Sequence, residues 1–270
     1  MGLIHFMWKK FKRWTSPSFL SDVIEIHRIS SIPRFLTSET KIFGKKFVFS
    51  DSASFIQSYH EIFEQKLYHF HSERNAPFIL DCGTNIGLSI LYYKRIYPNA
   101  RIIGFEPDPQ LFNILAANLR QFGYEDVELH QKAVLDEDSK VSFMAQGGAS
   151  GHVHDGHSQL ETGSVLVEVD AAALSPFINR EIDFLKIDIE GAEYKVLRSI
   201  AAKLHLVKRL FVEYHSFKTR EQELDLILGL LRNAKFRYYL YPAIDKEFPF
   251  QGIGEVEGMD MQLNIYAIRE

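Results

Sequence analysis

Residues 77–109 constrain the fold of this chain more than any other part of its sequence. This stretch contains, in order, the apolar run 78–80, Asp81, Gly83, Gly87, the apolar-rich segment 88–96, a second apolar run 102–105, and Glu106. Strands and helices produce such apolar runs, and glycines allow a tight turn between them. The order therefore predicts a strand, a glycine turn, a helix and a strand that ends in an acid, the first half of a nucleotide-type βαβ unit.

The predicted turn is suited to binding a ligand. In such a unit the strand brings its carboxyl end to the sheet edge, and glycines let a ligand approach the backbone. Glu106 comes 106 − 83 = 23 residues after Gly83, close to the roughly 20 expected for an acid that binds ribose hydroxyls. The next glycine is Gly87, however, so the G-x-G-x-x-G dinucleotide fingerprint is absent. An NAD-type oxidoreductase is therefore the alternative interpretation, not the leading one.

The composition is that of an ordinary globular protein. Its 270 residues suffice for one large domain, or for a domain with an added lobe. The apolar share of 46% supports a full core, and the net charge of −4 argues against nucleic acid as a partner. No apolar run reaches the roughly 18 residues of a transmembrane helix. Cys82 is the only cysteine, so no intrachain disulfide can form, which favours a cytoplasmic location.

Residues 1–76 are predicted to form an N-terminal α+β lobe that covers the sheet or the active site, before a ligand-binding domain over 77–270. Helical apolar spacing covers 21–32 and 54–70, and 40–49 is predicted to be a hairpin. The chain begins with a basic and aromatic stretch, MGLIHFMWKKFKRW, that lacks the features of a signal peptide. Peripheral contact with an anionic membrane is one interpretation of this stretch. Packing on the chain's own fold, or on a partner subunit of a homo-oligomer, is the favoured one.

Strands and helices alternate after residue 78. Further helices are predicted over 110–122, from 192 and over 219–231, and further strands over 127–134, 140–145, 164–171, 184–189, 209–215, 236–241 and 261–268. The last two strands are expected to form an antiparallel hairpin. The alternation predicts a doubly wound, mainly parallel sheet with right-handed crossovers.

A long polar loop and a set of ionisable side chains are the remaining candidates for function. The loop, 146–163, contains His152, His154 and His157 and is predicted to face the substrate as a lid, not to bind a metal. The ionisable groups that follow predicted strands are Asp81, Glu106, Asp188, Glu190, Glu213 and His215. Because parallel strands end at the same sheet edge, these groups predict one shared site.

Five motifs share their order and spacing with a known family. They are FILDCGTNIGLS (78–89), GFEPDP (104–109), QKAV (131–134), FLKIDIEGAEYKVL (184–197) and VEYH (212–215). Through them the chain resembles the FkbM family of class I S-adenosylmethionine (SAM) methyltransferases. The resemblance implies an α/β, Rossmann-like fold with a doubly wound, mainly parallel seven-stranded sheet. It also implies SAM-dependent methylation of a hydroxyl group on a sugar, glycan or secondary metabolite. Another acceptor, such as a lipid or a peptide, is the alternative within this class.

The resemblance further implies roles for the residues that match the motifs. The implied SAM-binding residues are Asp81, Gly83, Thr84, Asn85, Gly87, Glu106, Pro107, Asp108, Ala133 and Asp188. Among them, Glu106 would bind the ribose hydroxyls, Ala133 would lie beside the adenine, and Asp188 would lie near the sulfonium.

Methylation of a hydroxyl group also requires a proton acceptor, and a histidine or a carboxylate with a shifted pKa can serve. We predict His215 as the general base, with Glu213 beside it for orientation and Asp188 as the second candidate. Asp188, Glu190, Glu213 and His215 could instead bind a divalent metal such as Mg²⁺. We favour a site without metal, in which Glu190 and Glu193 supply negative charge at the start of a helix.

Overall fold

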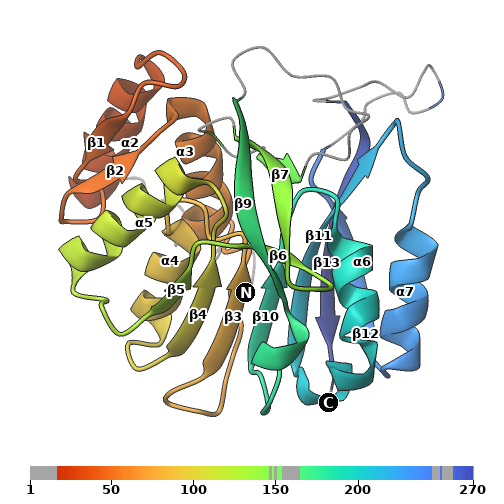
Figure 1. Ribbon diagram of the computed structural model, residues 1–270. Coiled ribbons are helices and arrows are strands. Elements are labelled where there is room, and N and C mark those ends of the chain that lie inside the picture. The colour runs from red at the N-terminus through yellow and green to blue at the C-terminus, as the bar shows by residue number, and fades with distance from the viewer. Residues whose placement is uncertain are drawn as a thin grey trace.

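The computed structural model describes residues 17–145, 148, 151–153, 165–244, 250 and 258–269. Its centre is a seven-stranded sheet with the strand order β12-β13-β11-β10-β3-β4-β5 (Figure 1). The strands are β3 (Phe78–Cys82), β4 (Arg101–Phe105), β5 (Glu128–His130), β10 (Phe184–Ile187), β11 (Arg209–Phe217), β12 (Arg237–Pro242) and β13 (Met259–Ile268). β13 is antiparallel to both of its neighbours, and the other pairs are parallel. The predicted α/β fold, with a mainly parallel sheet and a final antiparallel hairpin, is confirmed.

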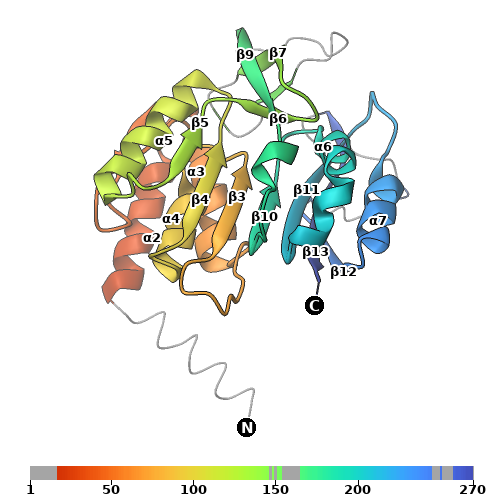
Figure 2. The ribbon, with the colours of Figure 1, turned by 60° about the horizontal axis from the view of Figure 1, so that its bottom comes forward.

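Helices cover both faces of this sheet, because successive residues of its strands are apolar and point to opposite faces (Figure 2). On one face, Ile79 packs in a core with α4 (Leu88–Ile96) and α5 (Pro109–Phe122). On the other face, Leu80 packs in a core with α6 (Glu193–Ser199), α7 (Leu224–Asn233) and the 3₁₀ helices η2 (Ser175–Phe177) and η3 (Ala201–Leu206). The sheet is therefore doubly wound, as predicted.

The segment before β3 packs on the α4–α5 side of the sheet. It consists of α2 (Pro17–Ser30), β1 (Ser38–Thr40), β2 (Phe47–Phe49), α3 (Ser52–Tyr59) and the π-helix η1 (His60–Glu64). Strands β1 and β2 form the predicted hairpin. Phe47 and Phe55 share one core with Ile79 and Leu115, and the Asn118 amide of α5 exchanges hydrogen bonds with the backbone of Val48. The core of this segment is continuous with that of the sheet, so the structure does not mark it off as a separate domain. Its division from the rest of the chain as an N-terminal lobe stays a prediction.

A second, four-stranded sheet with the order β6-β9-β7-β8 lies beyond the carboxyl ends of the central strands (Figures 1 and 2). Its strands are β6 (Ala133–Leu135), β7 (Ser139–Ala145), β8 (His152–Val153) and β9 (Val165–Ala173). The prediction of one strand over 127–134 is therefore wrong. The chain leaves the central sheet after β5, and β6 pairs with β9 instead. Apolar patterning shows that a residue is buried but not in which sheet it lies.

Other predicted elements also differ in their bounds, among them the following three. The helix expected over 54–70 ends at Glu64, and Lys66 just beyond it has a positive φ of 62°. Leu67, Tyr68 and Phe70 are buried without being helical, so the apolar spacing continues past the end of the helix. The strand expected over 184–189 ends at Ile187, before the turn in which Glu190 and Gly191 have positive φ. The helix expected over 219–231 begins only at Leu224. None of the helices in the described parts of the chain combines the length and apolar character that crossing a bilayer requires.

Candidate active site

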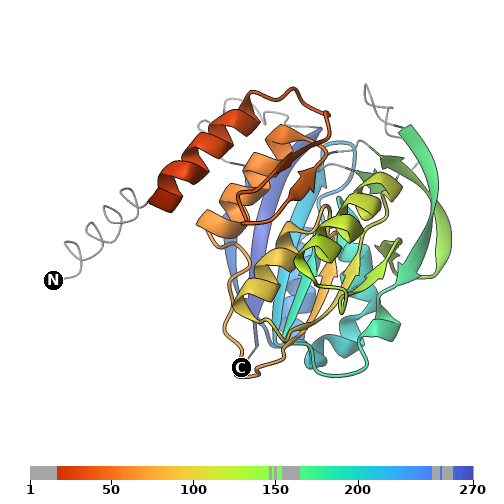
Figure 3. The same cartoon turned by 90° about the vertical axis from the view of Figure 1, so that its left-hand side faces the viewer.

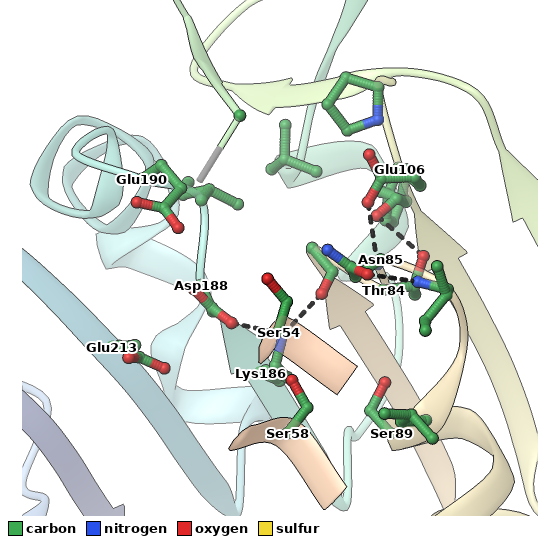
Figure 4. Close-up of a pocket in the computed structure, with 18 of the residues that line it drawn as sticks. Ser54, Ser58, Thr84, Asn85, Ser89, Glu106, Lys186, Asp188, Glu190 and Glu213 are labelled. Atoms are coloured by element: carbon green, nitrogen blue, oxygen red, sulfur yellow. Dashed lines mark hydrogen bonds and ion pairs between the residues drawn. The ribbon is translucent and has the colours of Figure 1, made fainter. Parts of the chain in front are cut away.

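One cavity lies at the carboxyl ends of β3, β4, β10 and β11, the edge where doubly wound sheets bind ligands (Figure 4). Its walls come from α3 and η1, the β3–α4 turn, four strand ends and the second sheet. The residues that line it include Ser54, Gln57, Ser58, Glu61, Tyr68, Gly83, Thr84, Asn85, Glu106, Pro107, Lys132, Ala133, Val134, Phe143, Lys186, Asp188, Glu190, Glu213 and Gln262.

The turn after β3 has a backbone path that depends on its first glycine. Gly83 has a φ of 89° and Asn85 a φ of 49°, both in the left-handed region. A Cβ atom on Gly83 would lie 1.9 Å from the carbonyl oxygen of Asp188. The glycine is therefore required by the close approach of the β3 and β10 ends, in addition to leaving the turn open to a ligand.

The carboxylate of Glu106, just after β4, is held by the same turn. The backbone N–H of Asn85 donates to one carboxylate oxygen at 2.8 Å, and the N–H of Asp108 donates to the other at 2.9 Å. Burial raises the pKa of Glu106 to about 8, although both hydrogen bonds act in the opposite direction. A carboxylate fixed in this way can accept hydrogen bonds from a pair of ligand hydroxyls.

A buried lysine joins the ends of β3 and β10. Lys186 Nζ lies 3.0 Å from Asp188 Oδ2 and 3.5 Å from Asp81 Oδ1, and it donates to the Gly83 carbonyl at 2.7 Å. Lys186 and Asp81 are register partners on adjacent parallel strands, so their side chains leave the same face of the sheet. Burial lowers the pKa of Lys186, but Asp188 and Asp81 outweigh it and the pKa is raised. Lys186 therefore stays charged and anchors Asp188 at the cavity wall.

His215 lies behind the cavity wall. Its Nδ1 is 3.0 Å from Glu193 Oε1, and its Nε2 is 3.5 Å from Glu190 Oε2. Burial lowers the pKa of His215, but these two carboxylates raise it well above its usual value. A histidinium held between two carboxylates is a poor proton acceptor, and His215 is not among the residues that line the cavity. This geometry argues against His215 as the general base that we predicted.

Glu213, two residues earlier on β11, does line the cavity. The side-chain amide of Gln262 on β13 donates a hydrogen bond to it. Burial raises the pKa of Glu213 to about 8, and the nearby charge of Asp188 acts in the same direction. The Glu213 carboxyl group therefore changes its protonation state at a pH of about 8.

Glu61 of η1 also lines the cavity and accepts a hydrogen bond from Gln57 at 3.1 Å.

The predicted cofactor-binding residues divide into two groups. Those that line the cavity are Gly83, Thr84, Asn85, Glu106, Pro107, Ala133 and Asp188. Asp81 lies below the cavity, where it accepts a hydrogen bond from Ser89 at 2.6 Å. Asp108 caps α5 through the backbone N–H groups that follow it. Gly87 has a φ of 95°, which favours glycine, and a Cβ atom there would lie 2.7 Å from the end of the Leu115 side chain. These three residues support the site without bordering it.

Three of the four residues considered for a metal lie close together. Donor atoms of Asp188, Glu190 and His215 all lie within 4.8 Å of one another, in a group that does not include Glu213. The Lys186 ammonium group already pairs with Asp188, and His215 pairs with Glu190. Both carboxylates of the group thus already have a partner within the protein, and the preference for a site without metal stays a prediction.

Sequence reasoning did not identify Lys186 as a site residue, although a signal was present. A lysine inside an apolar buried strand requires a carboxylate partner, but the partner depends on which strands are neighbours. The polar side chains of α3 and η1 were missed as well. Ser54, Gln57, Ser58 and Glu61 have the i, i+3, i+4, i+7 spacing of one helix face, and only the tertiary structure places that face on the cavity.

The predicted histidine-rich loop is only partly described. His154 and His157 lie outside the described residues. His152 lies in β8, where it is buried and its ring centroid is 5.8 Å from that of Phe217.

Comparison with known proteins agrees with this fold and site. The family model of the methyltransferase FkbM domain matches residues 81–238, which include the glycine turn, Glu106, Asp188 and His215. The crystal structure of methyltransferase FkbM from Methylobacillus flagellatus KT has the same fold, with a TM-score of 0.51 at 17% sequence identity. That similarity covers 77% of this chain and 48% of the other.

Two curated relatives are similar in sequence. Methyltransferase 1 of Beauveria bassiana (strain ARSEF 2860) is 32% identical over 161 residues, which cover 52% of this chain and 65% of the relative. The 31-O-demethyl-FK506 methyltransferase FkbM of Streptomyces tacrolimicus is 26% identical over 211 residues, which cover 66% of this chain and 80% of the relative. The chain thus spans slightly less than two thirds of the first relative and about half of the solved structure.

Proposed function

Because this chain belongs to the FkbM family of methyltransferases, we propose that it transfers a methyl group from SAM to a hydroxyl oxygen of a small molecule or glycan. The observation that carries this proposal is the cavity at the sheet edge, with the glycine turn and Glu106 on one side and Asp188 and Glu213 on the other (Figure 4). A two-sided cavity of this kind can hold a donor and an acceptor next to each other. The S. tacrolimicus relative, by its name, acts on a 31-O-demethyl compound, which supports oxygen as the acceptor atom.

The donor side has the chemistry that SAM requires. Glu106 can accept hydrogen bonds from ribose hydroxyls, and Ala133, Val134 and Phe143 offer apolar surface for the adenine. When bound, SAM supplies an electrophilic methyl group on a positively charged sulfur, and Asp188 provides the complementary negative charge. The ammonium group of Lys186 on this wall is already ion-paired. The family membership sets aside the NAD-type oxidoreductase that we considered as an alternative.

On the acceptor side, the chain's own residues can position a hydroxyl group and remove its proton. In-line methyl transfer depends chiefly on alignment of the reacting atoms, and the polar face of α3 and η1 supplies hydrogen-bonding groups for it. Glu213 is our choice of proton acceptor, because it lines the cavity and carries no ion pair with Lys186. His215 then acts as a positioning residue that holds Glu190 in place. Asp188 acts on the donor, through its negative charge beside the sulfonium.

Calorimetric titration tests the donor assignment. We expect the wild-type protein to bind SAM and not NAD. In a titration above pH 8, where the Glu106 carboxylate is ionised, the Glu106→Gln variant should bind SAM more weakly by about tenfold or more, because one hydrogen bond to a charged group is worth about 1.5–3 kcal/mol. Glu128→Gln is the matched control, since Glu128 is an exposed acid on the neighbouring strand β5. Binding of NAD without SAM would refute the proposal.

Transfer of the labelled methyl group of SAM tests the acceptor. Sugars, glycans, lipids and peptides are offered separately, and each product is treated with mild base. A label that stays attached identifies a methyl ether, whereas a carboxyl methyl ester is cleaved. Labelling confined to lipid or peptide would overturn the proposed acceptor while leaving methyl transfer intact.

A further inference from the structure

Helix α2 presents an apolar face to the outside of the molecule. Leu20, Val23 and Ile24 are 55%, 49% and 69% exposed, and their i, i+3, i+4 spacing places them on one side of the helix. The opposite side carries Ile26 and Ile29, which pack in the core. Figure 3 shows α2 on the periphery of the fold, next to α3. Single exposed apolar residues are normal, but a stripe of them turned away from the core marks an interaction surface.

The sequence before this helix has the composition that a lipid surface attracts. Residues 1–21 contain no acid, and the first acidic residue of the chain is Asp22. The same stretch carries four basic residues and both tryptophans of the chain, namely Lys9, Lys10, Lys12, Arg13, Trp8 and Trp14. Basic side chains are attracted to anionic headgroups, and tryptophan prefers the interface between membrane and water.

We propose that the apolar face of α2 and the basic stretch before it dock the protein on the surface of an anionic phospholipid membrane. In this arrangement Leu20, Val23 and Ile24 enter the boundary between headgroups and acyl chains, and the basic side chains contact the headgroups. A second copy of the chain fits this face less well. It would offer the face the same apolar stripe and the same excess of positive charge, whereas an anionic lipid surface complements both.

Tryptophan fluorescence gives a direct test, because both tryptophans lie in the basic stretch. The full chain is mixed with vesicles of phosphatidylcholine and phosphatidylglycerol, or of phosphatidylcholine alone. We expect a blue shift of the emission and co-sedimentation with the anionic vesicles. Vesicles of phosphatidylcholine alone should bind much less protein, and high salt should weaken the anionic binding through screening.

Two variants separate the apolar contribution from the electrostatic one. Leu20→Ser/Ile24→Ser should weaken binding to anionic vesicles by about tenfold or more, since each buried methylene contributes about 0.8 kcal/mol. Lys9→Glu/Lys10→Glu/Lys12→Glu should weaken it by about a hundredfold or more, at about 1 kcal/mol for each basic residue lost. Leu226→Ser is the matched control, because Leu226 is a 43% exposed apolar residue on α7; its binding should equal that of wild type.

Three results would overturn the proposal. The first is the absence of co-sedimentation with either type of vesicle. The second is unchanged vesicle binding in the Leu20→Ser/Ile24→Ser variant, which would exclude α2 from the surface. The third is a concentration-dependent dimer without vesicles that this variant abolishes, which would assign the face to a second copy. Methyl transfer is not measured in any arm, so the outcome is independent of the proposed reaction.

Discussion

At the scale of single residues, Gly83 is the position where the site allows least variation. Its φ of 89° lies in the left-handed region, where a side chain costs roughly 1–2 kcal/mol. The Asp188 carbonyl oxygen also occupies the space where a Cβ atom would lie. The same glycine thus permits both the shape of the turn after β3 and the close approach of the Asp188 backbone after β10.

Replacing Gly83→Ala should therefore lower both stability and donor binding. We expect the free energy of unfolding to fall by about 2–5 kcal/mol, the sum of backbone strain and overpacking, and SAM affinity to fall with it. Gly44→Ala is the matched control, because Gly44 has a φ of 84° and a Cβ atom added to it would meet nothing within 4 Å; it should lose only about 1–2 kcal/mol. Equal losses in urea denaturation would show that the approach of Asp188 is unimportant.

At the scale of elements, the turn between β10 and α6 is tied to β11 through His215. Glu190 in this turn and Glu193 at the start of α6 both contact the imidazole ring. Glu213 leaves the same face of β11 as His215, since the two are separated by one residue, but it reaches the cavity. One strand therefore supplies a group that faces the substrate and a second group that holds the neighbouring turn in place.

This division of roles predicts different pH profiles for two variants. If Glu213 accepts the proton, kcat/KM of the wild type should rise as pH increases through about 8, because only the ionised carboxylate is a base. Glu213→Gln should lower the rate by about 10²–10⁴-fold and remove this rise. His215→Gln should keep the rise at a reduced rate, and circular dichroism checks that both variants are folded. Loss of the rise in His215→Gln alone would restore His215 as the general base.

At the scale of the whole molecule, the central sheet concentrates acids at one buried edge. The folded-state pKa values of Glu106 and Glu213 are both raised to about 8, so the folded protein binds more protons than the unfolded chain above about pH 4.5. The stability that these groups contribute is present below that pH and is lost as pH rises through about 8. The raised pKa of His215 acts in the same direction.

The protein without ligand should therefore be less stable at pH 8 than at pH 5. The free energy of unfolding, measured in urea, should fall by up to about 1.4 kcal/mol per pH unit for each of the two glutamates. Glu106→Gln/Glu213→Gln should show a clearly smaller slope, whereas Glu128→Gln should keep the wild-type slope. A stability that stays constant or rises across this range would contradict the raised pKa values of the two buried glutamates.

Much of the fold followed from the sequence, because local patterns report local geometry. Apolar runs separated by a glycine turn predicted β3, α4 and β4, and the helix predicted over 110–122 is observed as α5. The structure adds its ends, an Asp108 cap, Pro109 in the first turn and Gly123 in the left-handed region. The boundary between β5 and β6 could not be predicted from such local patterns. Both are short apolar runs, and only pairing with β4 or with β9 separates them.

The sequence by itself determined that acids and a glycine turn meet at one sheet edge, because parallel strands deliver their ends to the same side. Only the tertiary structure decided what each group does there. It placed Glu213 in the cavity and His215 behind it, paired Lys186 with Asp81 across two strands, and brought Glu61 over the site from a distant helix. These relations join residues far apart in the chain, and they depend on strand order and on the face that each helix turns inward. Neither the strand order nor the inward face of a helix can be predicted from the residue spacing within one segment.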